Sequence, residues 1–282
     1  SGSAFSQRFA PAPRPRTRSE RIAVGSILTV FIAFLGVPIG LLVARSFRTP
    51  EGAIGLTNYA NLFGLPGRSA AFIDPLDAII NSLAFASVAL VLAMVVGMLL
   101  AMALSLSTHR AARAIDTFVM LPLATSAVTI GFGFLVALDW PIDLRGTAIL
   151  LPIAHALVAV PFVVRTASPA IGGIQPQVRE AAATLGADPW RVIRTIDLPL
   201  VRPALLVGAA FAFAISMGEF GATSFITRPA TPTIPVAIFR YLGQPGSVPF
   251  GAAIALSVVL MAVTALAVAS IDRIGLRSGS RP

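Results

Sequence analysis

Long apolar stretches, separated by short polar segments, make up most of the chain after residue 21. Six of these stretches approach or exceed the roughly 20 residues that a helix needs to cross a bilayer. Only helices and closed barrels satisfy their backbone polar groups within lipid, and barrel strands are shorter and alternate in polarity. The pattern therefore predicts an all-α integral membrane protein with six transmembrane helices, over residues 22–44, 78–104, 117–138, 147–164, 200–226 and 250–271.

The segments outside these helices are polar. Residues 1–21 are rich in Pro and Arg and are expected to form a disordered basic tail or linker. The start Ser1-Gly2-Ser3, without Met, fits either an added leader or a piece of a longer polypeptide. The first apolar stretch is too long for a signal peptide and is interpreted as a retained anchor, while residues 272–282 form a C-terminal tail.

Charge is scarce and unevenly distributed. The mean hydropathy is +0.86 and 12% of residues are charged, about half the share of a soluble domain. The net charge of +9 suggests nucleic acid, but the basic residues lie beside the apolar stretches, where membrane orientation explains them better. All 21 are arginines, and 15 of them lie in the tail, residues 105–116, residues 165–202 and the C-terminal tail. Placing these regions inside predicts cytoplasmic N- and C-termini.

A charged segment between the fourth and fifth helices is punctuated by Gly and Pro. Glu180 begins a run of helix formers, and Gly186, which tolerates a left-handed conformation, is expected to end it. Asp188 suits the N-cap of a second helix that begins at Pro189. The sequence therefore predicts a helix–Gly–helix elbow.

The second helix of this elbow is amphipathic, and Pro199 is expected to close it. Its apolar face consists of Trp190, Ile193 and Ile196, and the basic positions beside that face are Arg191 and Arg194. Such an elbow fits either a groove on a soluble partner or the bilayer surface. A Walker A motif requires Lys, which this chain lacks, so a separate subunit or domain must hydrolyse any ATP that drives transport.

The spacing of the elbow resembles a known motif. Glu-Ala-Ala, three residues, Gly, nine residues and Ile-x-Leu-Pro follow the order of the EAA loop in permease subunits of binding-protein-dependent ABC importers. The resemblance implies the type I permease fold, a multi-pass protein of a prokaryotic inner membrane, and cytoplasmic coupling helices that dock onto an ATPase. The docking residues that it implies are Glu180, Ala181, Ala182, Leu185, Gly186, Asp188, Trp190, Arg191, Ile196, Leu198 and Pro199.

The same resemblance implies the partners. Two ATPase subunits carry the ATP and Mg²⁺, a second permease half (identical, different or fused) completes the pathway, and a solute-binding protein delivers substrate outside. The chain itself is expected to bind no cofactor, metal or nucleic acid and to catalyse no reaction.

Two further stretches point to a narrower group. Residues 216–223 resemble the fifth-span signature of ferric-iron, thiamine, molybdate and sulfate permeases, and residues 227–240 look more like the iron and thiamine branch. Ferric iron or thiamine is therefore the expected substrate. Molybdate or sulfate is the alternative, followed by a phosphonate or a polyamine. An ion-coupled secondary transporter is a further alternative, although it would ordinarily carry more intramembrane charges.

Polar residues within the expected helices are candidates for the translocation pathway. Glu219 is the acidic residue well inside a span, where a charge usually faces a bundle interior or a cavity. It either lines the pathway or bonds to a neighbouring helix. The other candidates are Ser216, Thr223, Asn81, Thr125 and Ser126, for which interhelical hydrogen bonds are the alternative role. His155 is interpreted as a lone histidine rather than a metal ligand.

Overall fold

The computed structural model of this chain describes residues 17–49, 52–63, 73–106, 110–138, 140, 143 and 145–279. These residues are helical except for turns, short loops and one isolated β-bridge between Arg48 and Ile54. Most of the expected basic tail, residues 1–16, lies outside the described residues. Within the described part, the first helix begins at Arg18 rather than at residue 22, because Thr17 and Glu20 form a reciprocal capping box.

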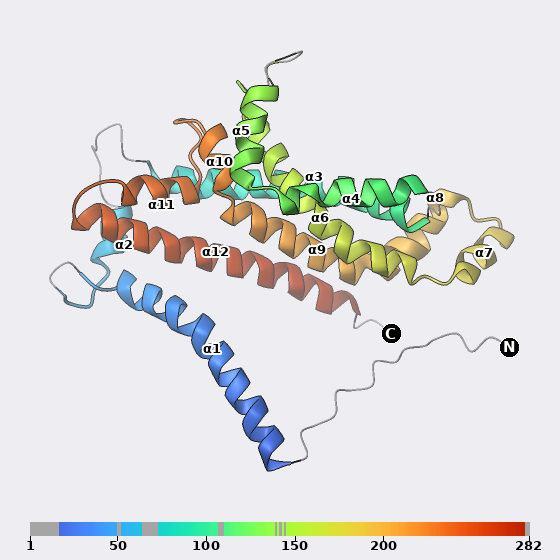
Figure 1. Cartoon of the computed structure of the whole chain (residues 1–282), viewed down its shortest axis with the longest axis horizontal. Helices are drawn as coiled ribbons and strands as arrows, with labels where there is room; N and C mark the ends of the chain where they lie inside the picture. Colours follow the sequence, from blue (N-terminus) through green and yellow to red (C-terminus); the bar gives the residue numbers. More distant parts are fainter. Residues whose placement is uncertain are drawn as a thin grey trace.

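Five long helices in the described part of the chain are apolar enough to cross a membrane. They are α1 (Arg18–Ser46), α3 (Pro75–Leu106), α6 (Leu150–Gly172), α9 (Leu198–Gly218) and α12 (Ser247–Gly279). Four of them form a bundle, whereas α1 touches α12 near one end and then diverges from it (Figure 1). The first, second, fourth and sixth expected spans therefore correspond to α1, α3, α6 and α12.

The third expected span is not one continuous helix. Helix α4 (Arg110–Ala124) and helix α5 (Ala127–Ala137) meet at an angle of 105°. The break falls at Thr125 and Ser126, where Ser126 has an extended backbone. Pro122, one turn earlier, has already removed one backbone donor from the helix.

The fifth expected span is also broken. Helix α9 ends at Gly218, Glu219 adopts an extended conformation, and helix α10 (Gly221–Ile226) follows. The start of this span differs as well, because a π-helical turn, Ile193–Asp197, joins the preceding short helix directly to α9. Pro199 therefore closes no helix; it is the second residue of α9.

The two breaks lie against each other. A Cβ atom on Gly221 would lie 2.9 Å from Cβ of Ala127, and one on Gly131 would lie 2.6 Å from Cα of Ala222. Only glycine permits such a close approach of α5 and α10. These two segments stand side by side across the direction of the long helices (Figure 1).

Helix α6 is the centre of the bundle. Val163 is fully buried between Gly97 of α3 and Gly208 of α9, and a Cβ on Gly97 would meet Cβ of Val163 at 2.7 Å. Small residues bring membrane helices into direct contact in this way.

Short helices mark the two ends of the bundle (Figure 1). One end carries α2 (Thr57–Phe63) and α11 (Ile234–Leu242). The other end carries α7 (Pro176–Thr184) and α8 (Pro189–Val192), which form the elbow. The arginine distribution places the elbow in the cytoplasm, and α2 and α11 therefore lie on the outer side.

Candidate functional site

The corner of the elbow is built as its sequence predicts. Gly186 has φ +80°, and its N–H donates to the carbonyl of Ala183 at 3.0 Å. The N–H of Ala187 donates to the carbonyl of Ala182, also at 3.0 Å. This pair of bonds is a Schellman motif, which ends α7 and turns the chain sharply.

The second arm is capped at its start. The Asp188 side chain accepts a hydrogen bond from the Arg191 N–H at 3.0 Å, and Pro189 is the first helical residue. Both features confirm the expected local structure. Glu180 differs from expectation, because α7 begins at Pro176 and places Glu180 in its middle rather than at its N-terminus.

An ion pair connects the elbow to the membrane helix that follows it. The guanidinium Nε of Arg179 on α7 donates to Oδ1 of Asp197 at 2.9 Å, and Asp197 is buried at the start of α9. With both partners largely removed from water, their ion pair holds α7 against the base of α9. The motif does not indicate this pair, because Arg179 lies just before its first residue and Asp197 occupies the variable position of Ile-x-Leu-Pro.

Much of the elbow surface is exposed to solvent. Leu185 is 89% exposed and Trp190 is 69% exposed, whereas Ile193 and Ile196 are half-buried beneath them. The expected apolar stripe is therefore divided into an inner part that packs on the chain and an outer part that is free to contact another molecule. The remaining exposed docking candidates are Glu180, Ala181, Gly186, Asp188, Arg191, Leu198 and Pro199, whereas Ala182 is half-buried.

A buried cluster of polar side chains lies at the far end of α9. His155 of α6 lies between two hydroxyls, with Nδ1 2.7 Å from Oγ of Ser216 and Nε2 2.7 Å from Oγ1 of Thr223. Its Nε2 is 3.5 Å from Oε2 of Glu219. All four side chains are buried. His155 is therefore not alone, and it joins α6 to both α9 and α10.

Glu219 serves as an internal cap for α10. Its carboxylate accepts hydrogen bonds from the N–H groups of Ala222 and Thr223, both at 2.9 Å, and from the Thr223 hydroxyl at 2.7 Å. Because that hydroxyl donates its single proton to Glu219, it must accept from Nε2 of His155. The carboxylate thus stabilises the first N–H groups of α10 and the break that precedes them.

The structure gathers most of the pathway candidates at the two adjoining breaks. Thr125 and Ser126 are exposed at the α4–α5 break, beside the buried cluster at the α9–α10 break. Asn81 lies elsewhere, and its Nδ2 donates to the carbonyl of Pro232 at 3.1 Å. The neighbouring Ser82 accepts from the N–H of Ile234 at 2.8 Å, so these two residues hold the start of α11.

Comparison with known proteins identifies the family that has this architecture. Residues 93–275 match the family described as the binding-protein-dependent transport system inner membrane component. The chain belongs to this family. It is therefore a permease component of an ABC transporter and a multi-pass protein of a bacterial inner membrane. Membership in this family excludes the alternative that the chain is an ion-coupled secondary transporter.

Two relatives have substrates in their names. PhnV of Salmonella typhimurium, named for 2-aminoethylphosphonate transport, is 31% identical over 95% of this chain and 98% of its own length. ModB of Escherichia coli, a molybdenum transport permease, is 33% identical over 60% of this chain and 81% of its own length. Neither name includes ferric iron or thiamine, so these relatives do not support the expected substrates.

Two solved structures share the fold. The permease of a bacterial alginate importer superposes with a TM-score of 0.69 at 22% identity, over 91% of this chain and 94% of its own. The MetNI methionine transporter gives a TM-score of 0.60 at 17% identity, over 72% of this chain and 95% of its own. The expected type I importer permease fold is thereby confirmed.

Proposed function

We propose that this family member forms one half of the pathway of an ATP-driven importer and receives the movement of an ATPase through the elbow. The observation that carries the proposal is the exposed, capped corner at Gly186, connected to α9 by the buried pair of Arg179 and Asp197. Two ATPase subunits with ATP and Mg²⁺, a second permease half and a solute-binding protein complete the transporter. This chain contributes neither a cofactor nor a catalytic residue.

The elbow provides a direct route from the ATPase to the middle of the membrane. A displacement of α7 moves Asp197 and therefore the start of α9. The other end of α9 carries Ser216 and Glu219, which contact α6 and α10. Movement of α9 relative to α6 then changes the packing of α10 against α5, where Thr125 and Ser126 are exposed. Rigid-body rocking of this kind is a common basis of alternating access.

We further propose that the substrate is a small phosphonate of the 2-aminoethylphosphonate class. The support is the relative PhnV, which matches nearly the whole of both chains. Molybdate is the second candidate, because ModB reaches a similar identity over a shorter part of this chain. Both candidates are compact oxyanions.

Uptake measurements separate these possibilities. Cells with and without the gene are given labelled 2-aminoethylphosphonate or labelled molybdate. Labelled ferric iron and labelled thiamine, the substrates expected from the sequence, are tested in the same way. We expect gene-dependent uptake of the phosphonate that stops when ATP is depleted and survives collapse of the proton gradient. Gene-dependent uptake of molybdate alone would replace the substrate proposal and leave the ATP-driven mechanism intact. Phosphonate uptake that follows the proton gradient instead of ATP would overturn the mechanism.

A further inference from the structure

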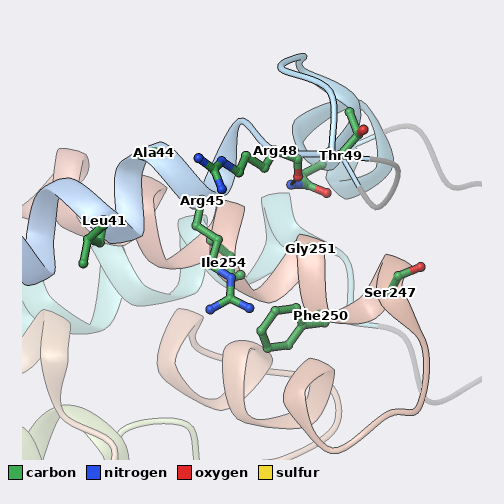
Figure 2. A pocket seen from close by; sticks show the side chains of 11 residues that line it. Leu41, Ala44, Arg45, Arg48, Thr49, Ser247, Phe250, Gly251 and Ile254 are labelled. Atoms are coloured by element: carbon green, nitrogen blue, oxygen red, sulfur yellow. Dashed lines mark hydrogen bonds between the residues drawn. The ribbon is translucent and has the colours of Figure 1, made fainter.

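A cavity of about 550 Å³ opens at the outer end of the bundle, far from the elbow. Figure 2 shows it between the last turns of α1 and the first turns of α12, with the segment that leads to α2 above it. The lining residues that matter here are Leu41, Arg45, Arg48, Thr49, Phe250 and Ile254. Nothing in the proposed transport mechanism uses this cavity.

Two positive charges line the cavity, and none of its lining residues in the described part of the chain is acidic. Arg45 extends from α1 so that its guanidinium lies 5.2 Å from the ring centre of Phe250 on α12 (Figure 2). Arg48 lies on the rim of the same opening. Across the described residues, the ion pairs involve other arginines, and neither Arg45 nor Arg48 has a carboxylate partner. Contact with an aromatic face leaves the N–H edges of a guanidinium open to a ligand.

The other polar groups around the cavity favour an acceptor-rich ligand. The Asn58 amide nitrogen is already committed, since it donates to the carbonyls of Ser46 and Arg48, both at 2.9 Å. The hydroxyl of Thr49 is buried and has no hydrogen-bond partner among the residues that the structure describes. The donors that line the cavity are therefore guanidinium N–H groups and the hydroxyls of Thr49 and Ser247. This donor set matches the oxygens of a phosphate group, which Arg binds with two parallel hydrogen bonds.

The lower wall of the cavity is apolar. Leu41 lies one turn before Arg45 on α1 and is 64% exposed, and Ile254 lies one turn after Phe250 on α12. Helices α1 and α12 separate below this point (Figure 1). A ligand that places phosphate among the arginines can thus extend an acyl chain along Leu41 and Ile254.

We infer that this cavity binds the phosphodiester headgroup of a phospholipid from the outer leaflet. Arg45 and Arg48 contact the phosphate, and the first methylenes of an acyl chain pack against Leu41 and Ile254. Charged arginines on the outer side of a membrane protein run against the usual orientation preference, and a bound headgroup accounts for their position. A free oxyanion offers the same phosphate chemistry but lacks the chain that the apolar wall requires.

The test is native mass spectrometry of the purified transporter with its partner subunits, titrated with phosphatidylglycerol. Arg45→Gln combined with Arg48→Gln is expected to weaken one lipid site per copy of this chain by about tenfold or more, because two charge-assisted bonds are lost. Arg240→Gln removes a matched outer-side arginine of α11 that does not line the cavity, and is expected to leave lipid binding unchanged. Size-exclusion profiles of all variants establish that each remains assembled.

Two additional arms keep the outcome unambiguous. Ile254→Trp retains both arginines but fills part of the space beside the apolar wall. It is expected to weaken binding at the same lipid site. Inorganic phosphate is added separately to the unmodified transporter. Equal lipid binding in the arginine double variant and the parent would overturn the inference. Displacement of the lipid by millimolar inorganic phosphate, with no effect of Ile254→Trp, would also overturn it and would assign the cavity to a free oxyanion.

Discussion

At the scale of single residues, Glu219 has a structural role that its charge alone does not reveal. Its carboxylate accepts three hydrogen bonds from the first turn of α10, and it is buried. Glu219→Gln replaces one acceptor oxygen with an NH₂ group, which leaves at least one donor without a partner. We expect the variant to lose about 1–3 kcal/mol of stability, the usual cost of an unsatisfied buried polar group.

Thermal unfolding of the purified permease in detergent, without its ATPase, measures this loss. Glu180→Gln is the matched control, because it makes the same substitution at an exposed position of α7. The control is expected to unfold at the parent temperature. An unchanged melting temperature for Glu219→Gln, together with a loss of uptake, would assign Glu219 to substrate contact instead of capping.

At the scale of elements, the corner of the elbow depends on one glycine. Gly186 has φ +80°, a conformation that costs an L-residue about 1–2 kcal/mol. Gly186→Ala is therefore expected to distort the corner and weaken binding of the ATPase several-fold, although an added Cβ meets no atom within 4 Å. Titration of the purified permease with its ATPase gives the affinity. Gly172→Ala, at a helical glycine with open space, is the control; equal affinities for both variants would argue against docking at this corner.

The connection between the elbow and α9 gives a separate prediction. Asp197→Asn keeps the shape of the side chain but removes the charge that pairs with Arg179. The ATPase is expected to bind and hydrolyse ATP as before, whereas fewer substrate molecules enter per ATP, because α7 moves without carrying α9. Transport and hydrolysis measured together in proteoliposomes give this ratio. Arg194→Gln changes an exposed charge within the same π-helical turn and should leave the ratio unaltered. An unaltered ratio in Asp197→Asn would show that the pair does not transmit movement.

The elements also show what the sequence can and cannot predict. The apolar stretches located the long helices, and the special chemistry of Gly186 and Asp188 located the corner, because both effects are local. The breaks at Ser126 and Glu219 were missed, because the surrounding residues remain apolar. An average of hydropathy along the chain does not detect a change in the direction of a helix. The contacts of His155 were missed for another reason, because Ser216 and Thr223 lie more than 60 positions away.

At the scale of the whole molecule, the broken third span decides the topology. If α4 and α5 together cross the membrane, the chain crosses six times and both termini lie in the cytoplasm. If the bent pair instead enters and leaves on one side, five crossings place the C-terminus outside. The distribution of arginines favours six crossings, because the end of α12 is arginine-rich like the N-terminal region.

The absence of cysteine from the sequence allows a direct test of this topology. Single variants Ser19→Cys, Ser247→Cys and Arg273→Cys place a thiol at the exposed start of α1, the exposed start of α12 and the last turns of α12. We expect a membrane-impermeant maleimide to label Ser247→Cys in intact cells, and to label the other two only after permeabilisation. Labelling of Arg273→Cys in intact cells, with Ser19→Cys still protected, would mean that α4 and α5 form a re-entrant hairpin. The adjoining breaks would then lie near one membrane surface, and the proposed route from the elbow through α9 to Thr125 and Ser126 would no longer reach the centre of the pathway.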